Sequence, residues 1–363
     1  MKLKRILGCV AFILIACVMM TVLCDLLELS NTSNFDKRYE TFRNLEKDTV
    51  DAVFLGTSGV DRYWIAPKAY EEYGMTVYPL AIESMPTWLM TNVLKDVFRY
   101  QDPKLIMIDA RSFGQSNVKK ENMEIFARRV LDSMEMFSLN RIEAGFKTMR
   151  VIHETFEDAP AFDISYLLSF VKYHDSWKDD DYKITNNLGS KEHEYGGFYI
   201  TGNSTKIQPQ EVRPYDFDLY TPLDPVTEES LYEILDFLED KDVEVLFVDT
   251  PQLKDDQEVG RGNTLYKILE ERGVDYIHFL SEDQSESLHV IDLDYNRDFY
   301  DAPHVNYYGA EKFTDYFAEY LDENYDLPDR RADDSVKKDW DGRYDAILDK
   351  IKADEKKKNS ANK

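Results

Sequence analysis

Two short stretches, far apart in the chain, carry side chains whose types and spacing suit nucleophilic catalysis. Asp301 precedes His304 by three residues, in a polar segment that leads into a helical pattern. A carboxylate in that position can accept the imidazole N–H, which fixes the tautomer and leaves the other ring nitrogen free as a general base. Such a pair needs a nucleophile. The best candidate is Ser58, which follows an apolar run at residues 52–55 and is flanked by glycines.

The surrounding pattern predicts an α/β fold that positions these residues. Short apolar runs typical of buried strands alternate with helical patterns, as expected of a parallel sheet. The predicted strands are residues 52–55, 76–80, 105–108, 243–248 and 276–279. Ser58 would then emerge at the carboxyl edge of the first strand, where open α/β sheets bind their ligands.

The ordered pair of motifs resembles the SGNH/GDSL hydrolase superfamily. Gly56-Thr57-Ser58 follows the first strand, and the pattern DxxHxNxxGAxK begins at Asp301, before the last long helix. GTS in place of GDS, together with an apolar N-terminal segment, is similar to an extracytoplasmic branch that includes the D-alanine transfer protein of teichoic-acid modification and the alginate-type O-acetyltransferases. The resemblance implies a three-layer α/β/α fold with a mostly parallel, flavodoxin-like sheet and a Ser-His-Asp triad.

The resemblance also implies an oxyanion hole, where this chain departs from the family pattern. The family uses the N–H of the nucleophile, a Gly after the second strand and an Asn after the third. Here Ala81 and Arg111 follow those strands. The expected replacement donors are the backbone N–H of Ala81 or Ile82 and the guanidinium of Arg111. Asn306 and Asp249 are further candidates for binding substrate, with packing as the alternative for Asp249.

The N-terminal segment predicts a single-pass membrane protein. Residues 6–24 contain no charge and follow the basic residues Lys2, Lys4 and Arg5. That length crosses a bilayer, and the positive flank places the body of the protein outside the cytoplasm. A cleaved signal peptide and a lipoprotein signal at Cys17 are the alternatives.

Changes in composition along the chain predict its organisation. The apolar anchor is followed by a charged stretch, by strand and helix alternation, by an aromatic-rich interruption of that alternation and, finally, by a charged end. The expected parts are an anchor at residues 1–25, a polar stalk at 26–50 and the two halves of one α/β domain at 51–115 and 221–327. Residues 116–220 are expected to form an insertion that covers the site as a lid or cap, and residues 328–363 a charged tail that forms a solvated, fraying helix.

Charge and cysteine usage narrow the chemistry. The formal net charge is −26, which disfavours nucleic acid as a partner and favours a neutral or cationic substrate, solubility being the alternative explanation. The three cysteines all fall inside the apolar segment, so the body has no disulfide framework and no thiol nucleophile. Histidines at metal-ligand spacing are also missing from the sequence, and no metal or cofactor is expected.

The resemblance, together with the predicted triad, implies an O-acyl esterase or O-acyltransferase that acts on a cell-envelope glycopolymer. The resemblance implies a multi-spanning membrane acyltransferase as partner. The alternative is a binding or scaffold protein of a surface polysaccharide or teichoic-acid system, whose oxyanion hole has decayed. In that case Ser58 would be a helix cap, and Arg111 would pair with Asp109 or Glu83.

Overall fold

The computed structural model describes residues 2–27, 34–114, 119–175, 178, 193–201, 215–279 and 289–361. Its centre is a five-stranded parallel sheet with strand order β2-β1-β3-β4-β5. The strands are β1 (Ala52–Gly56), β2 (Val77–Ala81), β3 (Leu105–Asp109), β4 (Glu244–Asp249) and β5 (Asp275–His278). This is the flavodoxin-like order, with a topological switch point between β1 and β3. The predicted fold class is therefore confirmed, with a strand at each of the five predicted places.

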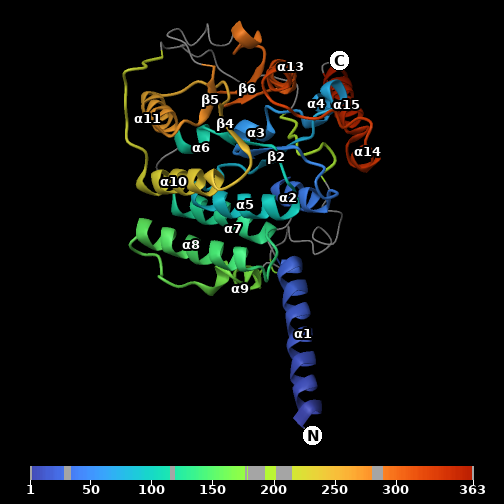
Figure 1. The fold of residues 1–363 in the computed structure, drawn as a ribbon, viewed down its shortest axis with the longest axis vertical. Helices are drawn as coiled ribbons and strands as arrows, with labels where there is room; N and C mark the ends of the chain where they lie inside the picture. Colours follow the sequence, from blue (N-terminus) through green and yellow to red (C-terminus); the bar gives the residue numbers. More distant parts are fainter. Residues whose placement is uncertain are drawn as a thin grey trace.

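Helices cover both faces of the sheet. α5 (Thr87–Tyr100) and α10 (Pro225–Glu239) pack on each other along one face, whereas α4 (Ala66–Tyr73) and α13 (Tyr307–Asn324) lie together on the other (Figure 1). This division follows from the right-handedness of parallel crossovers. The connection from β1 to β2 moves along the sheet in the direction opposite to that of the later connections, so its helix must lie on the opposite face of the sheet. Shorter helices, α3 (Ser58–Asp61) and α6 (Arg111–Gly114), follow β1 and β3 directly, and α11 (Asp256–Arg272) links β4 to β5.

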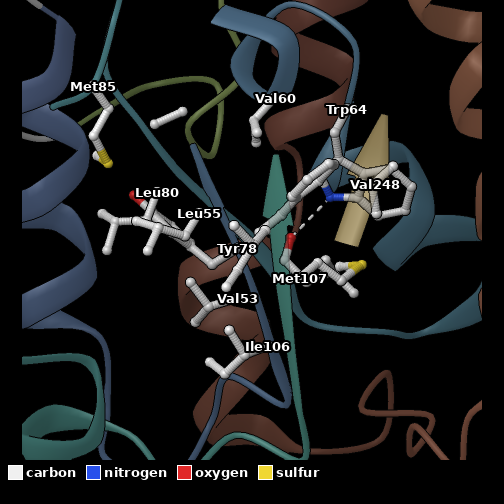
Figure 2. Close-up of a cluster of buried hydrophobic side chains, with 14 of the residues drawn as sticks. Val53, Leu55, Val60, Trp64, Tyr78, Leu80, Met85, Ile106, Met107 and Val248 are labelled. Atoms are coloured by element: carbon white, nitrogen blue, oxygen red, sulfur yellow. Dashed lines mark hydrogen bonds between the residues drawn. The ribbon is translucent and has the colours of Figure 1, made fainter. Parts of the chain in front are cut away.

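Trp64 joins the sheet to the α4 and α13 layer. Its side chain is fully buried, and its Nε1 donates to the Val77 carbonyl at 3.0 Å, the dashed line in Figure 2. The indole also packs edge-on against Phe317 of α13, with ring centroids 5.8 Å apart. An unpaired indole N–H at this depth would cost about 1–3 kcal/mol, so the hydrogen bond fixes how the segment after α3 lies on the sheet.

The prediction of a polar stalk at residues 26–50 is wrong for residues 34–50. Residues from α2 (Asn34–Asn44) onward belong to the folded body, where α2 packs on β2. Arg38 is buried and forms an ion pair with Asp61 at 2.6 Å, and the buried Tyr39 donates to Asp96 at 2.7 Å. Arg38 thus has a buried partner, whereas Glu46, Lys47 and Asp48 stay exposed, so one side of this segment packs on the body and the other faces solvent.

The charged tail is also more ordered than predicted. α14 (Asp334–Trp340) and α15 (Arg343–Ala361) form within residues 328–363. Trp340 is buried, with its ring 5.5 Å from that of Tyr70, and Ile347 is fully buried. A few apolar side chains are thus enough to attach two charged helices to the core. The predicted helix is present and mostly exposed, but its attachment at these positions was not predicted.

The insertion packs beneath the sheet as a second helical layer. It contains α7 (Lys120–Ser133), α8 (Leu139–Thr155), the 3-10 helix η1 (Ile164–Tyr166) and α9 (Ser169–Tyr173). α7 and α8 contact each other, α8 contacts α5, and α7 contacts α2 (Figure 1). α5 is buried on nearly all sides and therefore needs this outer cover. The rest of the predicted insertion, residues 116–118, 176–177, 179–192 and 202–214, lies outside the described residues.

α1 (Lys2–Leu27) projects away from the body (Figure 1). Its stretch Leu3–Cys24 is long and apolar enough to cross a membrane, and its most apolar 18-residue window is not buried by the rest of the chain. A membrane anchor and a signal sequence both fit this description. At its body end α1 contacts α9.

Candidate active site

The turn that carries Ser58 is held by a buried carboxylate. Thr57 is the N-cap of α3, with its side chain accepting from the Gly59 N–H at 3.3 Å. Both the backbone N–H of Thr57, at 3.0 Å, and its hydroxyl donate to one oxygen of Asp109 at the end of β3. A Cβ on Gly56 would lie 2.2 Å from the Asp109 Cβ, so only glycine lets β1 end this close to β3. Ser58 therefore begins the helix and is not its cap.

The structure brings the three predicted catalytic residues together. Ser58 Oγ lies 2.7 Å from His304 Nε2, and His304 Nδ1 lies 2.6 Å from Asp301 Oδ1. Asp301 ends β6 (Phe299–Asp301) and His304 begins β7 (His304–Val305), so the two residues face each other in a small antiparallel pair. The three side chains therefore lie as close as a triad requires, and their catalytic role stays a prediction. The polar sequence of this segment predicts a loop, whereas the structure forms these two short strands.

His304 is set up as a neutral base. Its side chain is 14% exposed, and this burial, followed by the positive charges of Arg62 and Arg111, lowers its pKa below the ordinary value. Hydrogen bonding to Asp301 directs the proton to Nδ1 and leaves the Nε2 lone pair toward Ser58. The loop before His304 is held in turn by Tyr63, whose hydroxyl lies 3.0 Å from the Pro303 carbonyl. The imidazole can therefore accept a proton at neutral pH.

Ser58 and His304 open into a cavity of about 300 Å³ at the carboxyl ends of β1, β2, β3 and β4. This is the switch point at which doubly wound sheets bind ligands. The wall is rich in charged and polar groups and consists of Ser58, Glu83, Ser84, Ala110, Arg111, Gly114, Asp249, Gln252, Lys254, Glu258, Gly262, Pro303 and His304. No described residue of the insertion is among them, so the predicted lid is wrong for that part.

Arg111 lies in this wall with its guanidinium available. Its NH1 donates to Thr250 Oγ1 at 3.2 Å, and its Nε has no hydrogen-bond partner among the described residues. The ion pair proposed as an alternative is not formed within the part of the chain that the structure describes, since Glu83 pairs instead with Arg129 at 3.5 Å. A Cβ on Gly59 would lie 2.9 Å from Arg111 NH1, so this glycine allows the guanidinium to approach the serine turn.

Two predicted site residues do not reach the cavity. Ala81 is fully buried inside β2, with its carbonyl accepting from Arg38 at 2.9 Å, and the N–H of Ile82 donates to Gly56 at 3.1 Å. β2 continues to this point, and the chain reaches the cavity only at Glu83 and Ser84. The φ of Ser84, 50°, lies in the left-handed region. Asn306 caps α13 by accepting from the Gly309 N–H at 3.1 Å, so its role is structural.

Asp249 lines the cavity, but its carboxylate is already engaged. One oxygen accepts from both Lys254 and the buried Tyr266 hydroxyl. Its other oxygen, Oδ1, is buried without a hydrogen-bond partner among the described residues, so contact with substrate stays a prediction. The same carboxylate positions Lys254, whose side chain is 5% exposed. Lys254 and the neighbouring Glu258 were missed in the sequence. The available signal was the polar segment that follows Asp249 at the carboxyl end of a strand.

A second, more apolar pocket of about 250 Å³ lies next to the first and shares Ser84 with it. Its wall comes from α5, α6, α7, the end of α8 and the start of α10, and it includes Trp88, Met123, Phe126, Phe156 and Val226. The described part of the insertion thus helps to form this pocket and not a lid. Trp88 Nε1 and Ser112 Oγ in its wall are buried without a hydrogen-bond partner among the described residues.

Metal ligation has no candidate in the described part of the chain, where no group of three or more His, Cys, Asp or Glu side chains is arranged to hold an ion.

Comparison with known proteins gives only distant likenesses. No protein-family model matches the sequence, and no curated protein is detectably similar to it. Among solved structures, a proposed acylhydrolase from Bacteroides fragilis NCTC 9343 aligns over 78% of this chain and 93% of its own, with 10% identity and a TM-score of 0.37. A proposed GDSL-like lipase from Parabacteroides merdae ATCC 43184 aligns over 76% and 96%, with 12% identity and a TM-score of 0.33. Likeness at this level supports no conclusion about activity.

Proposed function

We propose that this protein is a membrane-anchored serine esterase or acyltransferase that acts on O-acyl groups of a cell-envelope glycopolymer. One observation carries the proposal: the hydrogen-bonded chain from Ser58 Oγ through His304 to Asp301, with spacings of 2.7 and 2.6 Å. It is supported by the order of the two motifs, which resembles that of the SGNH/GDSL superfamily. Nucleophile, base and orienting carboxylate each occupy the position that their role requires.

The acylation step follows from this geometry. His304 Nε2 takes the proton of Ser58 Oγ while the oxygen attacks the ester carbonyl carbon. The C=O electron pair moves onto the carbonyl oxygen. As the first residue of α3, Ser58 has a backbone N–H without an intrahelical acceptor, and this group and the Arg111 guanidinium stabilise the oxyanion. Collapse of the tetrahedral intermediate breaks the C–O bond, and the alkoxide leaves with the proton from His304.

The second half of the reaction regenerates the serine. Water or a sugar hydroxyl gives its proton to His304 and attacks the acyl-Ser58 carbonyl. The new intermediate expels Ser58 Oγ, which recovers the proton. Attack by water makes the protein an esterase, and attack by a sugar makes it an acyltransferase.

The polymer and the partner follow from the resemblance, with limited support from the site. The polar wall containing Arg111, Lys254 and Glu258 suits a hydroxyl-rich substrate better than a hydrocarbon. α1 would keep the body at the outer face of the membrane, within reach of a multi-spanning acyltransferase that exports the acyl group. A single-pass topology with an extracytoplasmic body is part of the proposal.

A binding or scaffold role is the second candidate, and one observation favours it. The N–H of Ile82 is used inside the sheet, so a donor that the family pattern would place after β2 is missing. With fewer oxyanion donors the same fold would bind an acylated polymer without turning it over. The loss of one such donor costs roughly 3–4 kcal/mol in transition-state stabilisation.

The deciding experiment treats the purified full-length protein in detergent with a fluorophosphonate probe and with p-nitrophenyl acetate. We expect covalent labelling and ester turnover, both abolished in Ser58→Ala and retained in Ser335→Ala, a serine on α14 outside the cavity wall. Adding a sugar alcohol as acceptor then separates hydrolysis from transfer by the products formed. Equal labelling of wild type and Ser58→Ala would favour the binding role.

A further inference from the structure

The outer surface of the insertion carries a patch of exposed apolar side chains. On α8, Leu139, Ile142 and Phe146 are spaced three and four residues apart and therefore share one face. Leu139 is 85% exposed and Phe146 50% exposed. Single exposed apolar residues are ordinary, but several on one helix face call for a partner.

Neighbouring segments extend this stripe. Phe137, just before α8, is 53% exposed, and Phe162, just before η1, is 59% exposed. η1 contacts α8, and Ile164 within η1 is exposed as well. We refer to Phe137, Leu139, Ile142, Phe146, Phe162 and Ile164 as the outer patch. The exposed acid next to Ile142, Glu143, is neutralised by Lys95 at 2.6 Å.

The outer patch lies at the end of the body from which α1 projects. α9 contacts both η1 and α1, so the patch and α1 are linked through direct packing. Figure 1 shows α8 and α9 at that end of the body, with the axis of α8 running across that of α1. Cys24, near the body end of α1, is buried, so the junction is packed. A bilayer crossed by α1 would therefore meet the outer patch.

We propose that the outer patch rests in the headgroup region of the bilayer that α1 crosses, with α8 lying in the plane of the interface. This rests on the membrane anchoring in the proposed function, but not on catalysis. A helix with large apolar side chains on one face inserts to a depth of about 5–10 Å at the boundary between headgroups and acyl chains. Because α1 tethers the body, even a weak surface contact is populated.

Several features favour lipid over a protein partner. The patch is the outward face of a helix and not a groove, and it consists of phenylalanine, leucine and isoleucine, which fluid lipid accommodates without shape complementarity. Insertion depends on apolar area and not on attraction to anionic headgroups, because the chain carries a net charge of −26. The contact would hold the body, and with it the cavity at Ser58, at a fixed distance from the membrane.

The test measures lipid contact at single positions in the full-length protein. In a background where Cys9, Cys17 and Cys24 are serine, one cysteine replaces Phe146 or, as a matched control, the exposed Lys352 on α15. An environment-sensitive fluorophore is attached, and the protein is reconstituted in phosphatidylcholine vesicles, with or without lipid carrying a doxyl quencher near the headgroup end of the acyl chain. A third variant that keeps only Cys17 reports whether α1 itself lies in the bilayer.

We expect the probe at position 146 to be quenched at least about threefold more than the probe at position 352, because only the first lies at interfacial depth. Equal, weak quenching at both positions would overturn the proposal. A blue-shifted but unquenched probe at position 146 would also overturn it and would indicate a second copy or another protein on the patch. Failure of quenching at Cys17 would refute the anchoring premise, whereas ester turnover in the same samples reports on the proposed function separately.

Discussion

Asp109 holds both turns that form the catalytic cavity. One of its oxygens accepts from the backbone N–H and the hydroxyl of Thr57, and the other accepts from the Arg111 N–H at 3.1 Å. The carboxylate is fully buried, and burial raises its pKa, an effect opposed by Arg111 and by the Thr57 hydrogen bonds. The residue before the nucleophile and the proposed oxyanion donor are thus joined across the switch point by one side chain.

Replacing Thr57 by valine tests this link. The change removes the hydroxyl that donates to Asp109 and caps Gly59, leaving a buried carboxylate less satisfied. We expect the free energy of unfolding to fall by about 1–3 kcal/mol and kcat to fall more than KM rises, because Ser58 loses its positioning. Thermal unfolding and ester kinetics measure both effects.

The matched control is Thr76→Val, because Thr76 donates to Asp51 at 2.9 Å in another buried Thr–Asp pair, at the amino end of the strands. It should lose similar stability while keeping kcat. If both variants kept wild-type kcat, the Thr57 contact would be structural only.

The parts of the site that were predicted correctly are those encoded locally. Apolar runs ending in glycine or a polar residue predicted the strands, and Ser58, Asp301 and His304 were identifiable because strand ends and helix starts of an α/β sheet converge at one edge. The parts that were missed depend on partners distant in the chain. The sequence around Arg38 does not show that this residue forms a buried ion pair with Asp61, so the pattern predicts a solvated stalk instead.

The prediction of a backbone oxyanion donor at Ala81 or Ile82 failed for a similar reason. Whether Ala81 ends a strand or continues it depends on pairing with Gly56, which the apolar pattern alone does not determine. Lys254 was missed because its burial depends on Asp249 and on the packing of α11.

As pH falls, activity should be lost at a lower pH than it would be with a histidine of ordinary pKa as the base. Burial and the charges of Arg62 and Arg111 lower the pKa of His304 from 6.5, so the neutral base persists as pH falls. We expect kcat/KM at pH 6 to remain close to its value at pH 7.5, whereas an unperturbed imidazole would lose roughly three quarters of it. The released p-nitrophenol is measured after each reaction is stopped at alkaline pH, so that the product is ionised in every sample.

Arg62→Gln should shift this loss of activity toward higher pH. Of the two arginines, Arg62 lowers the pKa of His304 more than Arg111 does, and the substitution removes its charge. The stability linkage has the same sign. A lowered folded-state pKa means that the contribution of His304 to stability is present above about pH 6.5 and is lost as pH falls below it. An acid limb at or above the ordinary histidine value in the wild type would contradict the burial argument.

The apolar pocket beside the cavity predicts a preference for esters longer than acetate. Each buried CH2 group is worth about 0.8 kcal/mol, or roughly fourfold in kcat/KM, until the pocket is full. Val226→Trp would fill part of the pocket, so we expect about tenfold slower turnover of p-nitrophenyl hexanoate with little change for the acetate. Val290→Trp, at an exposed position outside the pocket, is the control. A flat chain-length profile in the wild type would show that the acyl group lies elsewhere.

Replacing Arg111 distinguishes the catalytic proposal from the binding proposal most directly. Its guanidinium lines the cavity with Ser58 and His304, donates to the neutral Thr250 hydroxyl and lies 5.6 Å from the centroid of the Tyr63 ring. If it stabilises the oxyanion, Arg111→Ala should lower kcat by about a hundredfold to a thousandfold with little change in melting temperature. Arg150→Ala, which removes an exposed arginine paired with Glu229, controls for loss of charge. Arg111→Lys should recover only part of the rate, because an ammonium group lacks the planar donor geometry of the guanidinium. A large drop in melting temperature with kcat retained would instead assign Arg111 to the scaffold and leave the Ser58 N–H as the remaining oxyanion donor in the proposal.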